Sequence, residues 1–192
     1  MLSNKYGHVL DKTFSRIAKI IPFSPNALSI TGFLVTLFAC YRLSFNLLSG
    51  GTLILVGALF DMLDGAVART KNKMTRFGSF LDSVLDRYSD AFIFLAIAYS
   101  LGRASNITGV ILCLGTLLGS FMTSYSRARA EGIGEKCKLG IMERPERIIL
   151  ISLGTISGFI IPALWVLVVL TNFTVMQRIY YVWNVTNNKI RS

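Results

Sequence analysis

The chain has 192 residues, of which 53% are hydrophobic and 16% are charged. Soluble domains carry about a quarter charged residues, so this composition favours one integral membrane domain over residues 1–192. A formal net charge of +10 would suit nucleic acid, but the basic residues lie between apolar runs without interleaved aromatic residues. We therefore expect no nucleic-acid partner and interpret the basic residues as determinants of membrane topology.

The first predicted element covers residues 5–21. Apolar residues recur on one helical face from Leu10 to Ile21, whereas the lysines and the arginine of this segment lie on other faces. This pattern is typical of an amphipathic helix that lies on a membrane surface. Pro22 and Pro25 follow it and separate it from the apolar part of the chain.

Six membrane-spanning helices are predicted over residues 26–185, which makes the chain an all-α integral membrane protein. Each long apolar run supplies roughly the 20 residues that a bilayer core requires. The last stretch is too long for one helix, and Gly158 with Pro162 offers a turn that divides it. The expected spans are residues 26–47, 52–70, 77–101, 107–128 and two within 148–185, with the first turn at residues 49–51.

The basic residues orient these spans. With the N-terminus inside, only Arg42 and Arg103 fall on the outer side, Arg87 lies within the third span, and the other basic residues fall on the inner side. This distribution follows the positive-inside rule. We therefore expect a multi-pass protein of the cell membrane with both termini on the cytoplasmic side.

Four aspartates stand inside this apolar region. Asp61 and Asp64 are three residues apart, and Asp82 and Asp86 are four apart, so each pair shares one face of a helix. A short basic loop joins the two segments, which predicts neighbouring antiparallel helices with converging carboxylates near the cytoplasmic end. Such a cluster repels itself unless cations lie between the carboxylates, and its oxygen ligands suit Mg²⁺, Mn²⁺ or Ca²⁺.

These aspartates belong to a longer pattern, which reads Asp61-x2-Asp64-Gly65-x2-Ala68-Arg69-x8-Gly78-x3-Asp82-x3-Asp86. This pattern resembles the complete signature of the CDP-alcohol phosphotransferase family. The family resemblance implies a six-helix membrane enzyme, with a homodimeric assembly, that moves a phosphate-linked lipid from a CDP-lipid to an alcohol and releases CMP.

The resemblance also implies roles for individual residues. Asp61, Asp64 and Asp82 would hold metal, expected to be two Mg²⁺ or Mn²⁺ ions, and Asp86 would be both a metal ligand and the general base. Asp90 lies one turn further and outside the signature, so we interpret it as the partner of a nearby cation such as Arg87. The residues expected to contact the CDP-lipid are Asn26, Ser29, Gly65, Ala68, Arg69, Thr75 and Gly78.

The acceptor is indicated by two arginine-rich segments, residues 124–131 and 143–147. They resemble the subgroup that makes phosphatidylinositol phosphate, or its archaeal ether-lipid counterpart, from L-myo-inositol 1-phosphate. The donor would be CDP-diacylglycerol or CDP-archaeol. Arginine binds phosphate through two parallel hydrogen bonds, although ordinary positive-inside residues paired with glutamates would give a similar charge pattern. The candidate acceptor ligands are Arg127, Arg129, Arg144 and Arg147.

Other functions fit parts of this pattern. The same chemistry could use glycerol 3-phosphate, serine or free inositol as the acceptor. A membrane prenyltransferase also uses aspartates with magnesium, and an ion-coupled transporter could use buried carboxylates. Release of CMP in the presence of Mg²⁺ distinguishes the phosphotransferase from both of these.

Overall fold

The computed structural model describes residues 18–137 and 139–191, with side chains described up to residue 187. These residues form helices and loops and contain no β-strand, which confirms the all-α prediction. Of the predicted surface helix, only residues 18–21 belong to the described part, and residues 18–20 are helical. The long helices are α2 (Pro25–Leu43), α3 (Leu47–Thr70), α4 (Arg76–Arg103), α5 (Ile107–Gly132), α6 (Arg144–Ser157) and α7 (Ile160–Arg191).

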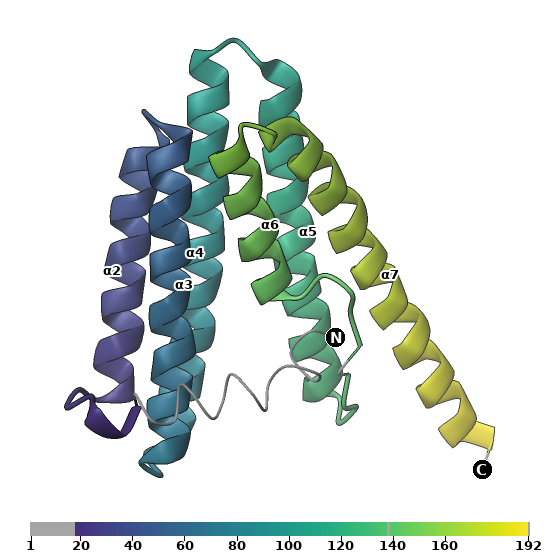
Figure 1. The fold of residues 1–192 in the computed structure, drawn as a ribbon. Helices are drawn as coiled ribbons and strands as arrows, with labels where there is room; N and C mark the ends of the chain where they lie inside the picture. The colour runs from purple at the N-terminus through teal and green to yellow at the C-terminus, as the bar shows by residue number, and fades with distance from the viewer. Residues whose placement is uncertain (1–17, 138, 192) are drawn as a thin grey trace.

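The helices run up and down in one bundle (Figure 1). Helix α2 packs on both α3 and α4, α3 packs on α6, and α5 packs on α4 and α7. The two aspartate-bearing helices, α3 and α4, approach each other closely at few backbone positions, whereas α2 packs on both of them and α6 packs on α3. The loop at residues 71–75 lies at the lower end in Figure 1, and the loop segments 133–137 and 139–143 run from the lower end of α5 up to the start of α6. The turns at 44–46, 104–106 and 158–159 lie at the upper end.

Four helical segments of the described chain are long and apolar enough to cross a bilayer: α2, α3, α5 and Ile160–Asn187 of α7. Large apolar side chains on their outer faces, such as Leu34, Phe38, Leu118 and Val169, are exposed and suit contact with lipid. The protein is therefore a multi-pass membrane protein. Helix α4 is less apolar because it carries the aspartates, and α6 has only 14 residues.

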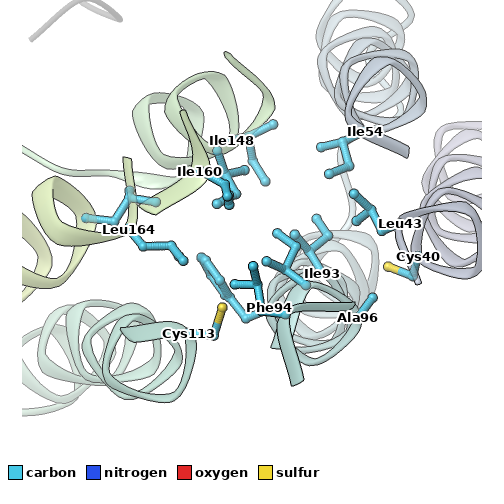
Figure 2. Packing of buried hydrophobic residues seen from close by; sticks show 14 of the residues in the cluster. Cys40, Leu43, Ile54, Ile93, Phe94, Ala96, Cys113, Ile148, Ile160 and Leu164 are labelled. Carbon is cyan, nitrogen blue, oxygen red and sulfur yellow. The ribbon is translucent and has the colours of Figure 1, made fainter. Parts of the chain in front are cut away.

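An apolar core holds the upper part of the bundle together. Side chains from all six helices meet there, among them Leu43, Ile54, Ile93, Cys113 and Leu164 (Figure 2). Each fully buried aliphatic side chain of this kind stabilises the fold by about 1.5–3 kcal/mol. Along α3 and α4 this core lies above the carboxylates, so the polar residues gather in the lower half of the bundle.

The first predicted turn, at residues 49–51, is wrong. The chain turns at residues 44–46 instead, and the Asn46 side chain caps α3 by accepting a hydrogen bond from the Ser49 N–H at 3.0 Å. Gly50 and Gly51 lie inside α3, where a Cβ would come within 2.4 Å of Leu43 Cγ and 2.1 Å of Thr155 Oγ1, respectively. These glycines therefore permit close helix packing and do not form a turn.

The turn between α6 and α7 agrees with the prediction. Gly158 ends α6 with φ of 78°, a left-handed conformation that glycine adopts without strain. Pro162 lies in the first turn of α7, where a missing N–H breaks no helical hydrogen bond. The short α6 spans about 21 Å, so its N-terminus lies inside the bundle and carries its arginines to the depth of the aspartates.

Candidate functional site

The structure brings carboxylates from α3 and α4 together through a side chain of α6. Nη1 of Arg144 lies 2.7 Å from Asp61 Oδ2 and 2.9 Å from Asp86 Oδ1. Asp61 comes from α3 and Asp86 from α4, so one guanidinium connects the two aspartate-bearing helices. We call Asp61, Asp64, Asp82 and Asp86 the acidic cluster.

The other two members of the acidic cluster lie close to this contact. Asp64 is 5% exposed and accepts a hydrogen bond from the Ser29 hydroxyl of α2. It lies within electrostatic range of Asp61 and Asp82, and Asp82 is itself within range of Asp61 and Arg144. The four carboxylates therefore share one environment, as the sequence predicts.

The composition of the acidic cluster fits a hard divalent cation. All its ligand atoms are carboxylate oxygens, and it already holds a positive charge between two of them. In the present arrangement, no three Asp, Glu, His or Cys side chains of the described residues are gathered closely enough to coordinate a metal. The Arg144 guanidinium lies at the Asp61 and Asp86 oxygens, which are the oxygens that a metal held by these residues would use.

The residues predicted to bind the CDP-lipid form two groups at the lower end of the bundle. Thr75 caps α4 by accepting a hydrogen bond from the Gly78 N–H at 2.9 Å, and a Cβ on Gly78 would lie 2.8 Å from Asn26 Oδ1. On α3, the Arg69 guanidinium packs over Gly65, 3.3 Å from where a Cβ would stand. The absence of a side chain at both glycines leaves room beside polar groups.

Two further residues of that prediction lie beside these groups. Ser29 binds Asp64 and so connects the N-terminal turns of α2 to the acidic cluster. Ala68 is half-buried on α3, one residue before Arg69. All seven predicted residues therefore lie on α2, α3 or the start of α4, around the acidic cluster.

A cavity of about 1000 Å³ opens on the other side of Asp86. It is formed by α4, α5, α6 and α7 and the loop before α6, and Asp86 is the one member of the acidic cluster that lines it. We call it the arginine cavity. The arginines that line it are Arg87, Arg127, Arg144, Arg147 and Arg178.

Comparison with known proteins identifies the family. A model of the CDP-alcohol phosphatidyltransferase family matches residues 23–186. The chain belongs to this family. It is 40% identical over 187 residues to an archaetidylinositol phosphate synthase of Methanothermobacter thermautotrophicus, covering 94% of this chain and 93% of that protein.

Solved structures of a related enzyme have the same fold. The phosphatidylinositol phosphate synthase of Mycobacterium tuberculosis with CDP-DAG bound has a TM-score of 0.81 and 31% identity, covering 90% of this chain and 94% of that one. The same enzyme in complex with manganese and citrate has a TM-score of 0.80 and 31% identity, covering 90% and 88% of the two chains.

These comparisons confirm the resemblance of the signature to a CDP-alcohol phosphatidyltransferase. The protein is a transferase and a membrane-bound enzyme of phospholipid synthesis, and the prenyltransferase and transporter hypotheses are set aside. The role of each site residue stays a prediction, which the contacts in the arginine cavity refine.

Asp90 shows one such refinement. Its Oδ2 accepts hydrogen bonds from Ser120 Oγ at 2.6 Å and from Arg147 Nη2 at 2.7 Å, and the aspartate is 3% exposed. The prediction that Asp90 is the partner of a cation is confirmed, but that cation is Arg147 and not Arg87. Arg87 instead donates to the carbonyl of Ser83 one turn earlier on α4.

The two arginines predicted on α5 have different surroundings. Arg127 lines the arginine cavity and lies 3.1 Å from Glu131 and 3.7 Å from Glu143. Arg129 is exposed and does not line the cavity. Residues two apart on a helix point in nearly opposite directions, so both cannot face one ligand.

Sequence reasoning counted Arg178 only as a topology residue. It is 3% exposed, lines the arginine cavity, and donates to the Leu139 carbonyl at 2.7 Å and to the Thr123 carbonyl. Its nearest carboxylate contact is Glu143 at 3.6 Å. The sequence does contain a signal for Arg178, which is an arginine within a largely apolar run. A cation in a membrane segment is a candidate functional residue.

Proposed function

We propose that the protein transfers a phosphatidyl-type group from a CDP-lipid to a hydroxyl of L-myo-inositol 1-phosphate and releases CMP. The donor carries diacylglycerol or archaeol phosphate. The support is the family membership, the similarity to an archaetidylinositol phosphate synthase and a phosphatidylinositol phosphate synthase, and an arginine cavity that adjoins the acidic cluster.

In this proposal the donor binds on the side of the acidic cluster. Asn26, Thr75 and Gly78 surround one part of the nucleotide, and Gly65, Ala68 and Arg69 surround another, with Ser29 holding Asp64 in place. Asp61, Asp64, Asp82 and Asp86 would hold Mg²⁺ or Mn²⁺, two ions as the family resemblance implies, which would offset the charge of the donor diphosphate.

The acceptor phosphate binds in the arginine cavity. Arg127, Arg147 and Arg178 are the ligands that the contacts favour, since each lines the cavity and can donate to phosphate oxygens. Arg147 and Arg178 are held in place, by Asp90 and by two backbone carbonyls respectively. Groups already fixed in place lose little entropy when the acceptor binds.

The chemistry then centres on Asp86. Its carboxylate takes the proton of the attacking hydroxyl, and the oxygen forms a bond to the lipid-linked phosphorus. The bond from that phosphorus to the bridging oxygen breaks, and CMP leaves with the electron pair. Asp86 is suited to this role because it belongs to the acidic cluster and also lines the arginine cavity. This double position is the observation that carries the proposal.

The acceptor is tested by an assay with purified protein in detergent, Mg²⁺ and radiolabelled donor. CDP-diacylglycerol and CDP-archaeol are each incubated with inositol 1-phosphate, glycerol 3-phosphate, serine or free inositol. We expect lipid product and CMP with inositol 1-phosphate. Product with serine or glycerol 3-phosphate alone would overturn the proposed acceptor and leave the transferase class intact.

We also propose that the chain is a single domain that crosses the membrane six times, with α4 and α6 as the additional spans and the site on the cytoplasmic side. The loops at 71–75 and 133–143 carry basic residues, whereas Arg42 and Arg103 lie at the other end of the bundle. Single cysteines at Lys73 and Ser105, probed with an impermeant thiol reagent in intact cells, test this. Labelling of the Lys73 position without permeabilisation would contradict it.

A homodimer in the membrane is the assembly that the family resemblance implies. Large apolar side chains are exposed along the outer faces of the helices and suit either lipid or a second copy. Native mass spectrometry from detergent tests this, and a purely monomeric spectrum at concentrations that support activity would contradict it.

A further inference from the structure

Arg144, one of the predicted acceptor ligands, makes two close contacts with carboxylates of the acidic cluster. Its Nη1 donates to Asp61 Oδ2 at 2.7 Å and to Asp86 Oδ1 at 2.9 Å. A divalent cation bound by these aspartates would use the same two oxygens. The guanidinium and the metal therefore compete for them, because one oxygen lone pair cannot serve both at these distances.

Asp90 offers Arg144 a second carboxylate. Nε of Arg144 lies 3.8 Å from Asp90 Oδ1, and both atoms are buried without a hydrogen-bond partner. Buried polar atoms nearly always find partners, because an unmade bond is costly in a site with little water. A small shift of the Arg144 side chain away from Asp61 and toward Asp90 would pair both atoms.

The receiving carboxylate is fixed in position. Asp90 Oδ2 is bound by Ser120 and Arg147, at 2.6 Å and 2.7 Å, so Oδ1 stays directed at Arg144. Arg144 itself is less constrained, with 22% of its side chain exposed toward the cavity. Movement is therefore expected in the arginine and not in the aspartate.

We propose that Arg144 exchanges between two carboxylate partners as metal binds. It joins Asp61 to Asp86 when these residues hold no metal, and it moves to Asp90 when metal takes their oxygens. Arg144 thus balances the charge of the acidic cluster, and Asp90 is a positioning residue that acts through Arg144. This inference rests on the proposed function only in taking Asp61 and Asp86 as metal ligands.

The first test measures Mn²⁺ affinity by electron paramagnetic resonance on the purified full-length protein, without substrates. Arg144→Gln removes the competing cation and should tighten Mn²⁺ binding by about tenfold, the size of one charge-assisted hydrogen bond. Arg127→Gln is the matched control, since Arg127 lines the same cavity but contacts Glu131 and Glu143. We expect it to change the affinity by less than about twofold. Unchanged or weaker Mn²⁺ binding in Arg144→Gln would overturn the exchange.

The second test asks whether Asp90 acts through Arg144. Asp90→Asn should weaken Mn²⁺ binding by roughly tenfold in the wild-type background and have no effect when Arg144→Gln is also present. Equal weakening in both backgrounds would mean that Asp90 acts on the metal directly, which overturns its proposed role. If Asp90→Asn does not fold, the comparison of Arg144→Gln with Arg127→Gln still tests whether Arg144 exchanges partners.

The wild-type protein is itself a test of the metal site. A wild-type protein that binds no Mn²⁺ would overturn the metal site, and with it the exchange of Arg144.

Discussion

The acidic cluster and the arginine cavity meet at Asp86 but are built in different ways. The acidic cluster comes from one helical hairpin, residues 61–86, with its members at helical spacing on two neighbouring segments of chain. The arginine cavity draws Arg127 from α5, Arg147 from α6 and Arg178 from α7, so its residues are far apart in the sequence. The donor side is therefore a local motif, whereas the acceptor side depends on how the whole bundle packs.

This difference suggests a division of labour. A local motif with fixed spacing suits the step that every enzyme of the family shares, which is holding a CDP-linked phosphate. A cavity assembled from several helices can change its lining residues one at a time, and so it suits the choice of acceptor. Variants at the two sites should consequently affect different kinetic constants.

The largest effect is expected where the two sites meet. Asp86→Asn keeps the size of the side chain but removes the group that takes the acceptor proton, so kcat should fall by about 10²–10⁴-fold. Binding of the CDP-lipid, measured by tritiated donor retained on the purified protein, should fall much less. A variant with near wild-type turnover would show that Asp86 is not the base.

The next largest effect is expected in the arginine cavity. Arg178→Gln removes a buried cation that is held by two backbone carbonyls and approaches its nearest carboxylate no closer than 3.6 Å. The KM for the phosphorylated acceptor should rise by roughly 10–100-fold, the size of one or two charge-assisted hydrogen bonds, with the KM for the CDP-lipid little changed. Equal rises in both constants would indicate general damage to the fold, which a thermal unfolding midpoint would also reveal.

A smaller effect is expected from Arg127, and Arg129 is its matched control on the same helix. Arg127→Gln should raise the acceptor KM by about tenfold, less than Arg178→Gln because Arg127 is more exposed to solvent. Arg129→Gln should leave both KM values unchanged, since Arg129 does not line the cavity. The reverse order of effects would contradict the geometry of α5.

The contrast between the two sites also explains what the sequence could predict. Asp61 with Asp64 and Asp82 with Asp86 were predicted because helical spacing puts each pair on one face of its helix. The helices α2, α3 and α5 were predicted because the apolar length that a bilayer requires has a simple physical limit. The role of Gly50 and Gly51 was misjudged, since turns and close helix contacts both select glycine. Only the packed helices distinguish these two uses.

The acceptor side was predicted less well, since Arg129 was included, Arg178 was left out and Asp90 was paired with Arg87. These errors also arise because packing between helices cannot be read from the sequence. The four predicted arginines were chosen from two segments rich in charge, and nothing in those segments separates Arg127 from Arg129 until α5 is placed against α4 and α7. The pairing of Asp90 with Arg147 joins residues 57 positions apart, and Arg178 reaches the loop before α6 from 39 positions away. Contacts over such separations carry no periodic signal.

The smallest effect is expected from a change that touches only the donor side. Gly78→Ala would place a Cβ 2.8 Å from Asn26 Oδ1 and 2.9 Å from Thr75 Oγ1. The Asn26 side chain can shift. Alanine favours the helix by about 1 kcal/mol over glycine, which offsets a disturbance of the Thr75 cap, so stability should change little. The displaced Asn26 should raise the KM for the CDP-lipid a few-fold while the KM for the acceptor stays constant.

Gly102→Ala on the same helix is the control, because its Cβ would meet only Val110 at 3.7 Å. If Gly78→Ala raised the acceptor KM instead, the assignment of donor and acceptor to opposite sides of Asp86 would have to be exchanged.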